Sequence, residues 1–272
     1  MRLALALLLA IPCATIGAQG REPLVEFGEM TWPEVKNALA AGKTTALYYT
    51  GGTEHRGPQN VNGGHNHMAR ATVKAIALAL GNAIAMPVLP YTPNNASAQL
   101  PGTIGLTPEL LGPILERLAE QAIATGFKNV VLMSDHGGGQ PDVYAAVATK
   151  LNAKYAPQGM RVIYSDSVYQ VQNEFELSLR ARGYPPSGHA ALFDTSEMIY
   201  VCGKECVRME ELQNALGDPV RLPGQPRDST TPRRNNGISG DARRSSAELG
   251  KELFDLRVTY AVRQIKRELG MK

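Results

Sequence analysis

The chain has 272 residues, of which 43% are hydrophobic, and its 28 basic and 25 acidic side chains give a formal net charge of +3. This charge is too small to indicate nucleic-acid binding, and the basic residues do not cluster with aromatic ones. A chain of this length buries enough surface for one large α/β domain. The composition therefore favours a folded protein that acts on a small molecule.

The first 18 residues are typical of an export signal. Arg2 precedes an apolar run over residues 3–11, and a stretch of small residues ends at Ala18. The apolar run is shorter than the roughly 20 residues that a membrane-spanning helix needs. We therefore expect cleavage near Ala18, a single mature domain over residues 19–272, and a periplasmic or secreted protein that is not held in a membrane.

The mature chain keeps two cysteines, Cys202 and Cys206, and a glycine lies between them. In an oxidising compartment this spacing favours a small disulfide loop. A zinc clip is the weaker alternative, because the sequence offers no second pair of ligands to complete it.

Helices and strands are expected to alternate in the first half of the mature chain. The patterns predict a helix over residues 31–42, a strand over 44–50, a helix over 66–80 and a strand over 83–91. Residues 92–106 contain prolines, glycines and asparagines without apolar periodicity, so they are expected to form a loop that borders a site.

The alternation continues in the second half. Helices are expected over residues 107–126 and 141–151, and strands over 129–134 and 161–165. Residues 221–244 lack apolar periodicity and are expected to form a surface loop or a subunit contact. A capping box at residues 245–248 then opens a last helix, whose apolar face continues to Leu269.

This alternation predicts an α/β fold in which a mainly parallel sheet is sandwiched between helices in three layers, α/β/α. Such folds present catalytic groups at the C-terminal ends of their strands. Two glycine-rich segments follow expected strands directly: residues 51–59 contain Glu54, and residues 134–140 contain His136. These acidic and imidazole side chains predict a metal-assisted hydrolase.

Three motifs resemble those of the creatininase family of metal-dependent amide hydrolases. The family's Gly-Ser/Thr-x-Glu-Gln-His-Gly-Pro-His motif corresponds to GTEHRGPQ at residues 52–59, and its Asn-Gly-His-Gly-Gly-Asn motif to SDHGGG at residues 134–139. The later His-Ala-Gly-x-x-Glu-Thr-Ser motif corresponds to HAALFDTS at residues 189–196, and residues 237–241 are similar to the C-terminal segment of the family. The resemblance implies a creatininase-like fold, hydrolysis of an amide bond in a small molecule, and a homo-oligomer, often a hexamer.

The typical family site holds two divalent ions, and the resemblance also shows where this chain departs from it. Glu54 and His136 stand at unshared ligands of the first ion, and His65 stands where an aspartate bridges both ions. Arg56 occupies the position of a histidine ligand of the second ion. A neutral imidazole offers one lone pair and a guanidinium cannot ligate. We therefore expect one divalent ion, zinc first with manganese or iron as alternatives, bound by Glu54, His65 and His136.

The third motif supplies His189 and Asp194. The resemblance implies that His189 is the acid and base that donates a proton to the leaving nitrogen. Asp194 replaces a glutamate of the family, and it is expected to act as a fourth metal ligand, a general base or a partner of a ligand histidine. Arg56 either supplies part of the second ion's charge and binds a substrate carboxylate or oxyanion, or only pairs with a nearby acid. His55 is expected to have a structural or exposed role.

Two functions from different classes remain open. The leading prediction is an exported metal-dependent hydrolase that cleaves a cyclic or linear C–N amide bond, and hydrolysis of amidines or lactones is a related possibility. The alternative is a catalytically inactive binding or structural protein on the same scaffold. Loss of the bridging aspartate favours the alternative, whereas retention of Glu54, His136 and His189 favours the enzyme.

Overall fold

A computed structural model describes residues 23–94, 99–138, 140–220 and 230–271. The expected export signal lies outside these residues, as does part of the predicted loop over residues 221–244. The division into a leader and one mature domain therefore stays a prediction. No helix in the described part of the chain has the length and apolar character needed to cross a membrane.

Four parallel strands form one sheet in the order β2-β1-β3-β4. Their bounds are β1 Thr45–Thr50, β2 Ala83–Ala85, β3 Asn129–Ser134 and β4 Arg161–Tyr164. The two central strands, β1 and β3, pair along their whole length, so that Thr50 lies opposite Ser134. The C-terminal ends of both strands therefore meet at one edge of the sheet, and the loops that follow them begin side by side.

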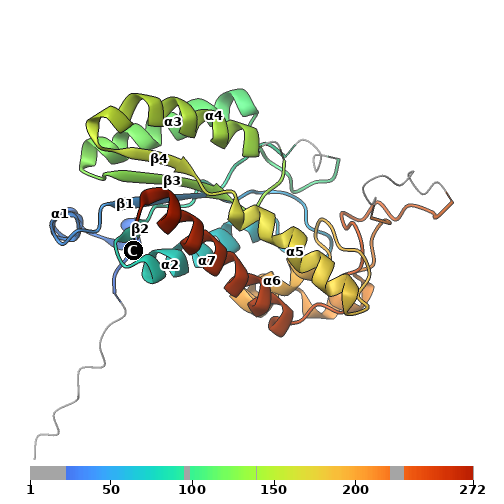
Figure 1. Ribbon diagram of the computed structural model, residues 1–272. Coiled ribbons are helices and arrows are strands. Elements are labelled where there is room, and N and C mark those ends of the chain that lie inside the picture. The colour runs from blue at the N-terminus through green and yellow to red at the C-terminus, as the bar shows by residue number, and fades with distance from the viewer. Residues whose placement is uncertain (1–22, 95–98, 139, 221–229, 272) are drawn as a thin grey trace, which may run out of the picture.

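Helices cover both faces of the sheet (Figure 1). On one face lie α2 (Gly64–Leu80) and α7 (Ala247–Leu269), and on the other lie α3 (Pro108–Thr125) and α4 (Gln140–Tyr155). A short α1 (Trp32–Ala40) precedes β1 and begins with a capping box between Thr31 and Glu34. The predicted three-layer α/β/α fold is confirmed.

Alternation along the strands explains why both faces are covered. In β1, Leu47 and Tyr49 pack in the cluster with α2 and α7, whereas Ala46 and Tyr48 pack in the cluster with α3 and α4. All six residues of β1 are buried. A strand that is buried on both faces has a continuous apolar run in its sequence, and this run is what predicts β1.

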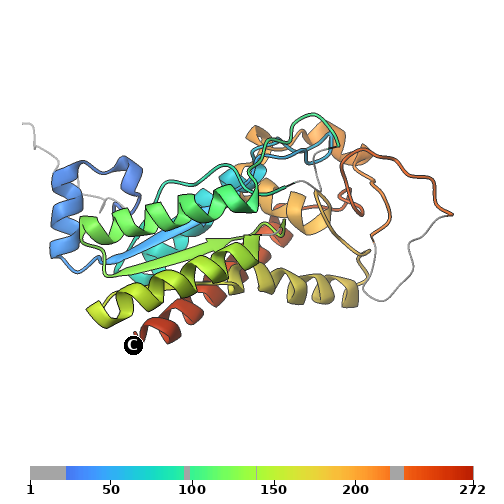
Figure 2. The same cartoon turned by 90° about the horizontal axis from the view of Figure 1, so that it is seen from above.

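Two helices were not predicted, and both lie beyond the sheet. Helix α5 (Ser167–Ala181) and helix α6 (Leu192–Cys202) pack on α7 and extend past the C-terminal ends of the strands (Figure 2). Apolar residues at spacings of three and four do mark α5 in the sequence. Helix α6 lacks such a pattern, because consecutive residues from Asp194 to Met198 are all buried. Of the strand predicted over residues 83–91, only residues 83–85 form a regular strand, which is β2.

A disulfide joins Cys202 at the end of α6 to Cys206. The residues just beyond it pair with the segment that separates Glu54 from α2: Val61 donates its N–H to Cys206 O at 2.9 Å, and Arg208 donates to Gln59 O at 2.7 Å. The disulfide therefore ties α6 to the loop that carries part of the site.

The close approach of α6 and α7 depends on Gly250. A Cβ at this position would lie 2.9 Å from Cα of Glu197, and closer still to the carbonyl group of Ser196. Because backbone atoms cannot move aside as a side chain does, we expect Gly250→Ala to lower the free energy of unfolding by about 3 kcal/mol. Urea unfolding measures the change.

Gly112→Ala is the matched control, because Gly112 is also a helical glycine. A Cβ there would meet only Val143, at 3.8 Å. This control should leave stability unchanged or raise it by up to about 1 kcal/mol. Equal losses in the two variants would contradict the packing argument.

Candidate metal centre and active site

The site forms where the loops after β1 and β3 meet. Strand order reverses between these two strands, since β1 connects through α2 on one face and β3 through α4 on the other. Open α/β sheets bind ligands in the crevice at such a point. The β1 loop supplies Glu54 and the β3 loop supplies Asp135 and His136, while His65 lies in the first turn of α2.

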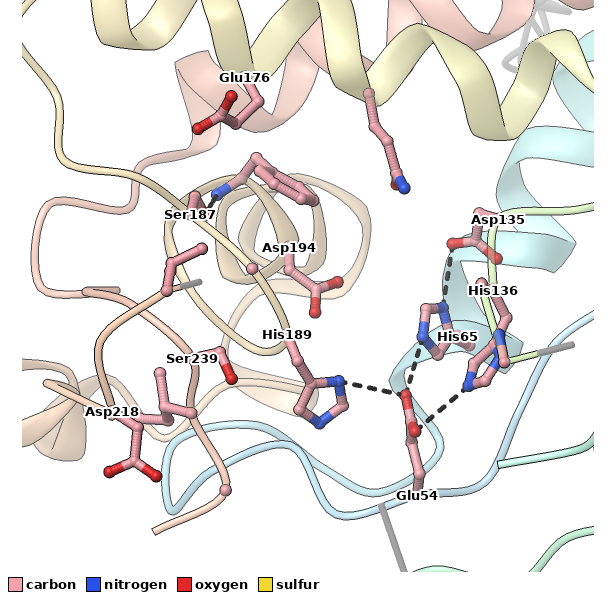
Figure 3. A pocket seen from close by; sticks show the side chains of 18 of the residues that line it. Glu54, His65, Asp135, His136, Glu176, Ser187, His189, Asp194, Asp218 and Ser239 are labelled. Carbon is pink, nitrogen blue, oxygen red and sulfur yellow. Dashed lines mark hydrogen bonds and ion pairs between the residues drawn. The ribbon is translucent and has the colours of Figure 1, made fainter. Parts of the chain in front are cut away.

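Glu54, His65 and His136 converge as the sequence predicts. Nε2 of His65 lies 3.1 Å from Oε1 of Glu54, and Nε2 of His136 lies 3.2 Å from Oε2 (Figure 3). All three side chains are buried, and one ligand atom from each falls within 4.8 Å of the others. Two imidazoles and a carboxylate are a common donor set for catalytic zinc.

Asp135 contacts the ring nitrogen of His65 that points away from Glu54 and so orients the ring. Its Oδ2 lies 3.1 Å from Nδ1 of His65, so the far nitrogen of the ring faces Glu54. Ligand histidines in metal sites are commonly held by a carboxylate in this way. Burial and the nearby Arg56 lower the pKa of His65, but Asp135 and Glu54 outweigh them and raise it to about 9. The ring is thus surrounded by negative charge and suits a bound cation.

His136 is held differently. The N–H of Gly138 donates to Nδ1 of His136 at 3.0 Å, so a neutral ring carries its proton on Nε2, where it faces Glu54. A ligand nitrogen must offer a lone pair. Binding an ion through Nε2 therefore requires this contact with Gly138 to open. The glycine allows close approach, since a Cβ at Gly138 would lie 2.6 Å from Cε1 of His136.

Arg56 is fully buried and forms no part of the cavity wall. Its Nη1 lies 3.4 Å from Oε1 of Glu54, and its Nη2 forms a short ion pair with Oδ1 of Asp194. A guanidinium enclosed in this way has no open path to a substrate. Its position favours the simpler of the two predicted roles, which is pairing with nearby acids.

Asp194 lies outside the group formed by Glu54, His65 and His136. One of its oxygens pairs with Arg56, and the other accepts the N–H of Ala190 at 2.8 Å. Burial would raise the pKa of Asp194, but the guanidinium of Arg56 lowers it. Because both oxygens are engaged, its position favours neither a fourth ligand nor a general base; Asp194 instead fixes Arg56.

His189 faces the same carboxylate from the opposite side. Its Nδ1 lies 3.5 Å from Oε1 of Glu54 (Figure 3). Its Nε2 lies 2.7 Å from the carbonyl oxygen of His55. Since a carbonyl only accepts, Nε2 carries a proton and Nδ1 is the atom free to exchange one. Burial lowers the pKa of His189, which favours the neutral ring.

The carboxylates at the centre outnumber the cations that contact them. Hydrogen bonds and nearby cations hold the pKa values of Glu54, Asp135 and Asp194 below their usual range despite burial, so all three are ionised. Arg56 is the guanidinium that contacts Glu54 and Asp194 directly. The raised pKa of His65 makes its ring a cation in the metal-free protein, so these groups and that ring together carry a net charge of −1. An ion that binds His65 displaces this proton, and the three carboxylates and one guanidinium then leave a net charge of −2, which one divalent cation neutralises.

Sequence reasoning missed several residues around this centre. His55 is buried rather than exposed, lines the cavity, and its ring lies edge-on to His189 with centroids 5.3 Å apart. Arg257 of α7 is also buried beside the cavity and pairs with Glu197 of α6 at 3.1 Å. The helical spacing of α7 predicts a core-facing position for Arg257, but no motif marks it.

The cavity above the centre has a volume of about 1230 Å³. Its floor contains Glu54, His65 and His136, and its walls include residues of α5, of the first turn of α6 and of the segments before α6 and α7. The two helices that were not predicted thus help to form the site.

We expect Arg56→Met to lower the free energy of unfolding by about 3 to 5 kcal/mol, because it leaves Glu54 and Asp194 buried without their shared cation. The double variant Arg56→Met/Asp194→Asn removes one of these orphaned charges. It should be more stable than the single variant, as measured by urea unfolding. A double variant no more stable than Arg56→Met would contradict this role for Arg56.

The fold and the buried cluster together define an α/β protein with a carboxylate and histidine centre at the ends of its strands. A family model described as Creatininase, creatinine amidohydrolase, matches residues 28–265, so this chain belongs to the creatininase family. The resemblance predicted from the three motifs is confirmed. A search of curated proteins gives no match.

Solved creatininase structures share the fold. A structure titled "Creatininase Mn" is 22% identical, with a TM-score of 0.71, and the match covers 91% of this chain and 99% of that one. A mutant creatininase described as Zn-Zn type is 21% identical, with a TM-score of 0.72 and the same coverages. A mutant creatininase complexed with creatine is also 21% identical, with a TM-score of 0.70 and the same coverages.

Proposed function

We propose that this protein is a metal-dependent amidohydrolase that cleaves a C–N amide bond in a small molecule. The observation that carries the proposal is the buried convergence of Glu54, His65 and His136 at the floor of an open cavity. Membership of the creatininase family supports the same class of chemistry. Two solved relatives are described by zinc or manganese, and a third is complexed with creatine.

The donor set fits one divalent ion. Glu54, His65 and His136 would hold it, with zinc as our first choice and manganese or iron as alternatives. When bound, such an ion polarises a carbonyl group and lowers the pKa of water. Once the ion displaces the proton of His65, the surrounding groups carry a charge of −2, which matches one such ion. Arg56 fills the position of a second-ion ligand and supplies a permanent positive charge there.

His189 is suited to moving the proton. The carbonyl of His55 holds its Nε2–H, so Nδ1 faces the cavity floor as a base. Nδ1 would accept a proton from the attacking water and pass it to the nitrogen that leaves. The neutral ring that burial favours is the form that begins this cycle.

A non-catalytic binding protein is the second candidate. The hydrogen bond from Gly138 to His136 favours it, because this bond stabilises a ring whose Nε2 is already protonated. The two candidates differ in one measurable property. The enzyme binds an ion tightly enough to break this contact, and the binding protein does not.

The experiment is a hydrolysis screen on the purified protein with added zinc or manganese. Lactams, linear amides, amidines and lactones serve as substrates, and a chelator-treated sample is the control. We expect metal-dependent turnover of at least one amide. Turnover that persists after chelation would remove the metal from the mechanism, and no turnover of any substrate would favour the binding protein.

We further propose that the protein is exported to the periplasm or secreted. The leader-like first 18 residues support this, as does the disulfide between Cys202 and Cys206, since disulfides persist in oxidising compartments. An N-terminus near Gln19 in the purified native protein is the expected result. From the family resemblance we also propose a homo-oligomer, with a hexamer as the first expectation, and light scattering measures its mass.

A further inference from the structure

Helix α5 has two distinct faces. Its buried apolar residues, Val168, Val171, Phe175 and Leu179, recur at spacings of three and four and pack inward. The residues of α5 that line the cavity follow the same spacing on the other face: Tyr169, Gln172, Asn173, Glu176, Leu177 and Arg180. Figure 3 shows Glu176 on this helix, across the cavity from Glu54. The cavity thus has a wall of hydrogen-bonding groups opposite the candidate metal centre.

Gln172 presents a donor to the cavity. The Nη2 of Arg257 donates to Oε1 of Gln172 at 3.3 Å. Because a guanidinium only donates, this contact decides the orientation of the amide, and the NH₂ group has no partner among the described residues. Arg257 itself is fixed, since its Nη1 donates to Val168 O at 2.6 Å and its Nε pairs with Glu197.

The neighbouring Asn173 presents an acceptor. Its Nδ2 donates to Oε1 of Gln170 at 3.2 Å, which leaves Oδ1 free for a ligand. Both Gln172 and Asn173 are accessible to solvent. A donor and an acceptor on adjacent residues match the C=O and N–H groups of a secondary amide.

Among the described residues, the charged side chains at the outer end of the cavity are paired. Glu176 pairs with Arg180 at 4.0 Å, and Asp218 pairs with Arg233 at 2.9 Å. A wall of neutral amides between paired charges suits a neutral hydrogen-bonding group better than an anion or a cation.

We propose that Gln172 and Asn173 bind a second amide group of the substrate, beyond the one that is cleaved. The substrate class is then an acylated amino acid or short peptide with at least two amides. The statement that the bound molecule is a substrate rests on the proposed amidohydrolase function. The binding itself requires only the geometry of α5 and Arg257.

The test compares two variants that add the same charge two residues apart on α5. Gln172→Glu keeps an acceptor for Arg257 but loses the NH₂ donor. Gln170→Glu keeps an acceptor for Nδ2 of Asn173 and serves as the control for charge, because Gln170 is exposed and does not line the cavity. The probes are N-acetylalanylalaninamide, which has several amides, and 2-pyrrolidinone, which has one. Dissociation constants for the metal-free proteins are measured by NMR titration of each probe.

We expect the peptide-like probe to bind the wild-type protein about tenfold more tightly than the lactam. Gln172→Glu should weaken binding of the peptide-like probe by about threefold to tenfold, whereas Gln170→Glu should change it by less than about twofold. Binding of the lactam should not change in either variant. Equal effects of the two variants on the peptide-like probe, or equal affinity of the wild type for both probes, would overturn the inference.

Hydrolysis of the same probes by the zinc-loaded protein separates this inference from the proposed function. If the binding pattern holds but no amide is cleaved, amide recognition stands and the hydrolase proposal fails. If the lactam is cleaved and the peptide-like probe neither binds nor reacts, the hydrolase proposal stands and the role of α5 fails.

Discussion

Replacing His136 with alanine is expected to abolish metal binding by the purified protein. The wild type should contain about one zinc, manganese or iron per chain, in keeping with the three-ligand donor set. The variant retains Glu54 and His65, but two ligands hold an ion far more weakly than three. Inductively coupled plasma mass spectrometry after dialysis measures the content directly.

His67→Ala is the matched control for this loss. His67 also lies in the first turns of α2, but its side chain is exposed and it is absent from the group around Glu54. The control should keep the metal content of the wild type. No metal in either the wild type or the control, even after incubation with excess zinc, would rule out the proposed centre and favour the binding protein.

Replacing His189 with alanine should leave the metal content unchanged and lower kcat by about 100-fold to 10,000-fold on any amide substrate found in the screen. The reason is that Nδ1 of His189 is free to exchange a proton beside Glu54, whereas its Nε2–H is held by the carbonyl of His55. Steady-state kinetics and metal analysis on the same preparation measure both quantities.

Rescue of turnover by added imidazole is a second test of the role of His189. A small imidazole that enters the cavity should restore part of the lost turnover, and it should have no such effect on the wild type. Unchanged kcat in His189→Ala would contradict the proton-transfer role. Loss of metal together with activity would instead make His189 a residue that supports the centre.

The main elements of the fold could be predicted from local patterns. The continuous apolar run of β1 reports burial on both faces of the strand, and the regular apolar spacing of α3 and α7 reports one buried side of each helix. Helix α6 escaped prediction because its turns carry buried polar groups such as Glu197 and Asp194, which pair with arginines far away in the sequence. Burial of that kind depends on partners rather than on periodicity.

The candidate ligands could also be predicted, because Glu54 and His136 stand within motifs that follow expected strands and His65 lies six residues after the first motif. The roles of Arg56 and Asp194 could not, since the sequence left several roles open for each. Their mutual ion pair spans 138 residues of chain and is visible only in three dimensions. That contact favours support of the centre over contact with substrate for both residues.

By itself, the sequence determined the family, the three-layer architecture and the chemical identity of the groups at the strand ends, because these depend on motifs and on local patterns of hydrophobicity. Tertiary structure alone decided which of those groups face one another. The pairing of Thr50 with Ser134 brings the two loops together, and the packing of α7 against α5 orients Gln172 through Arg257. Such contacts join residues that are distant in sequence, so no local pattern records them.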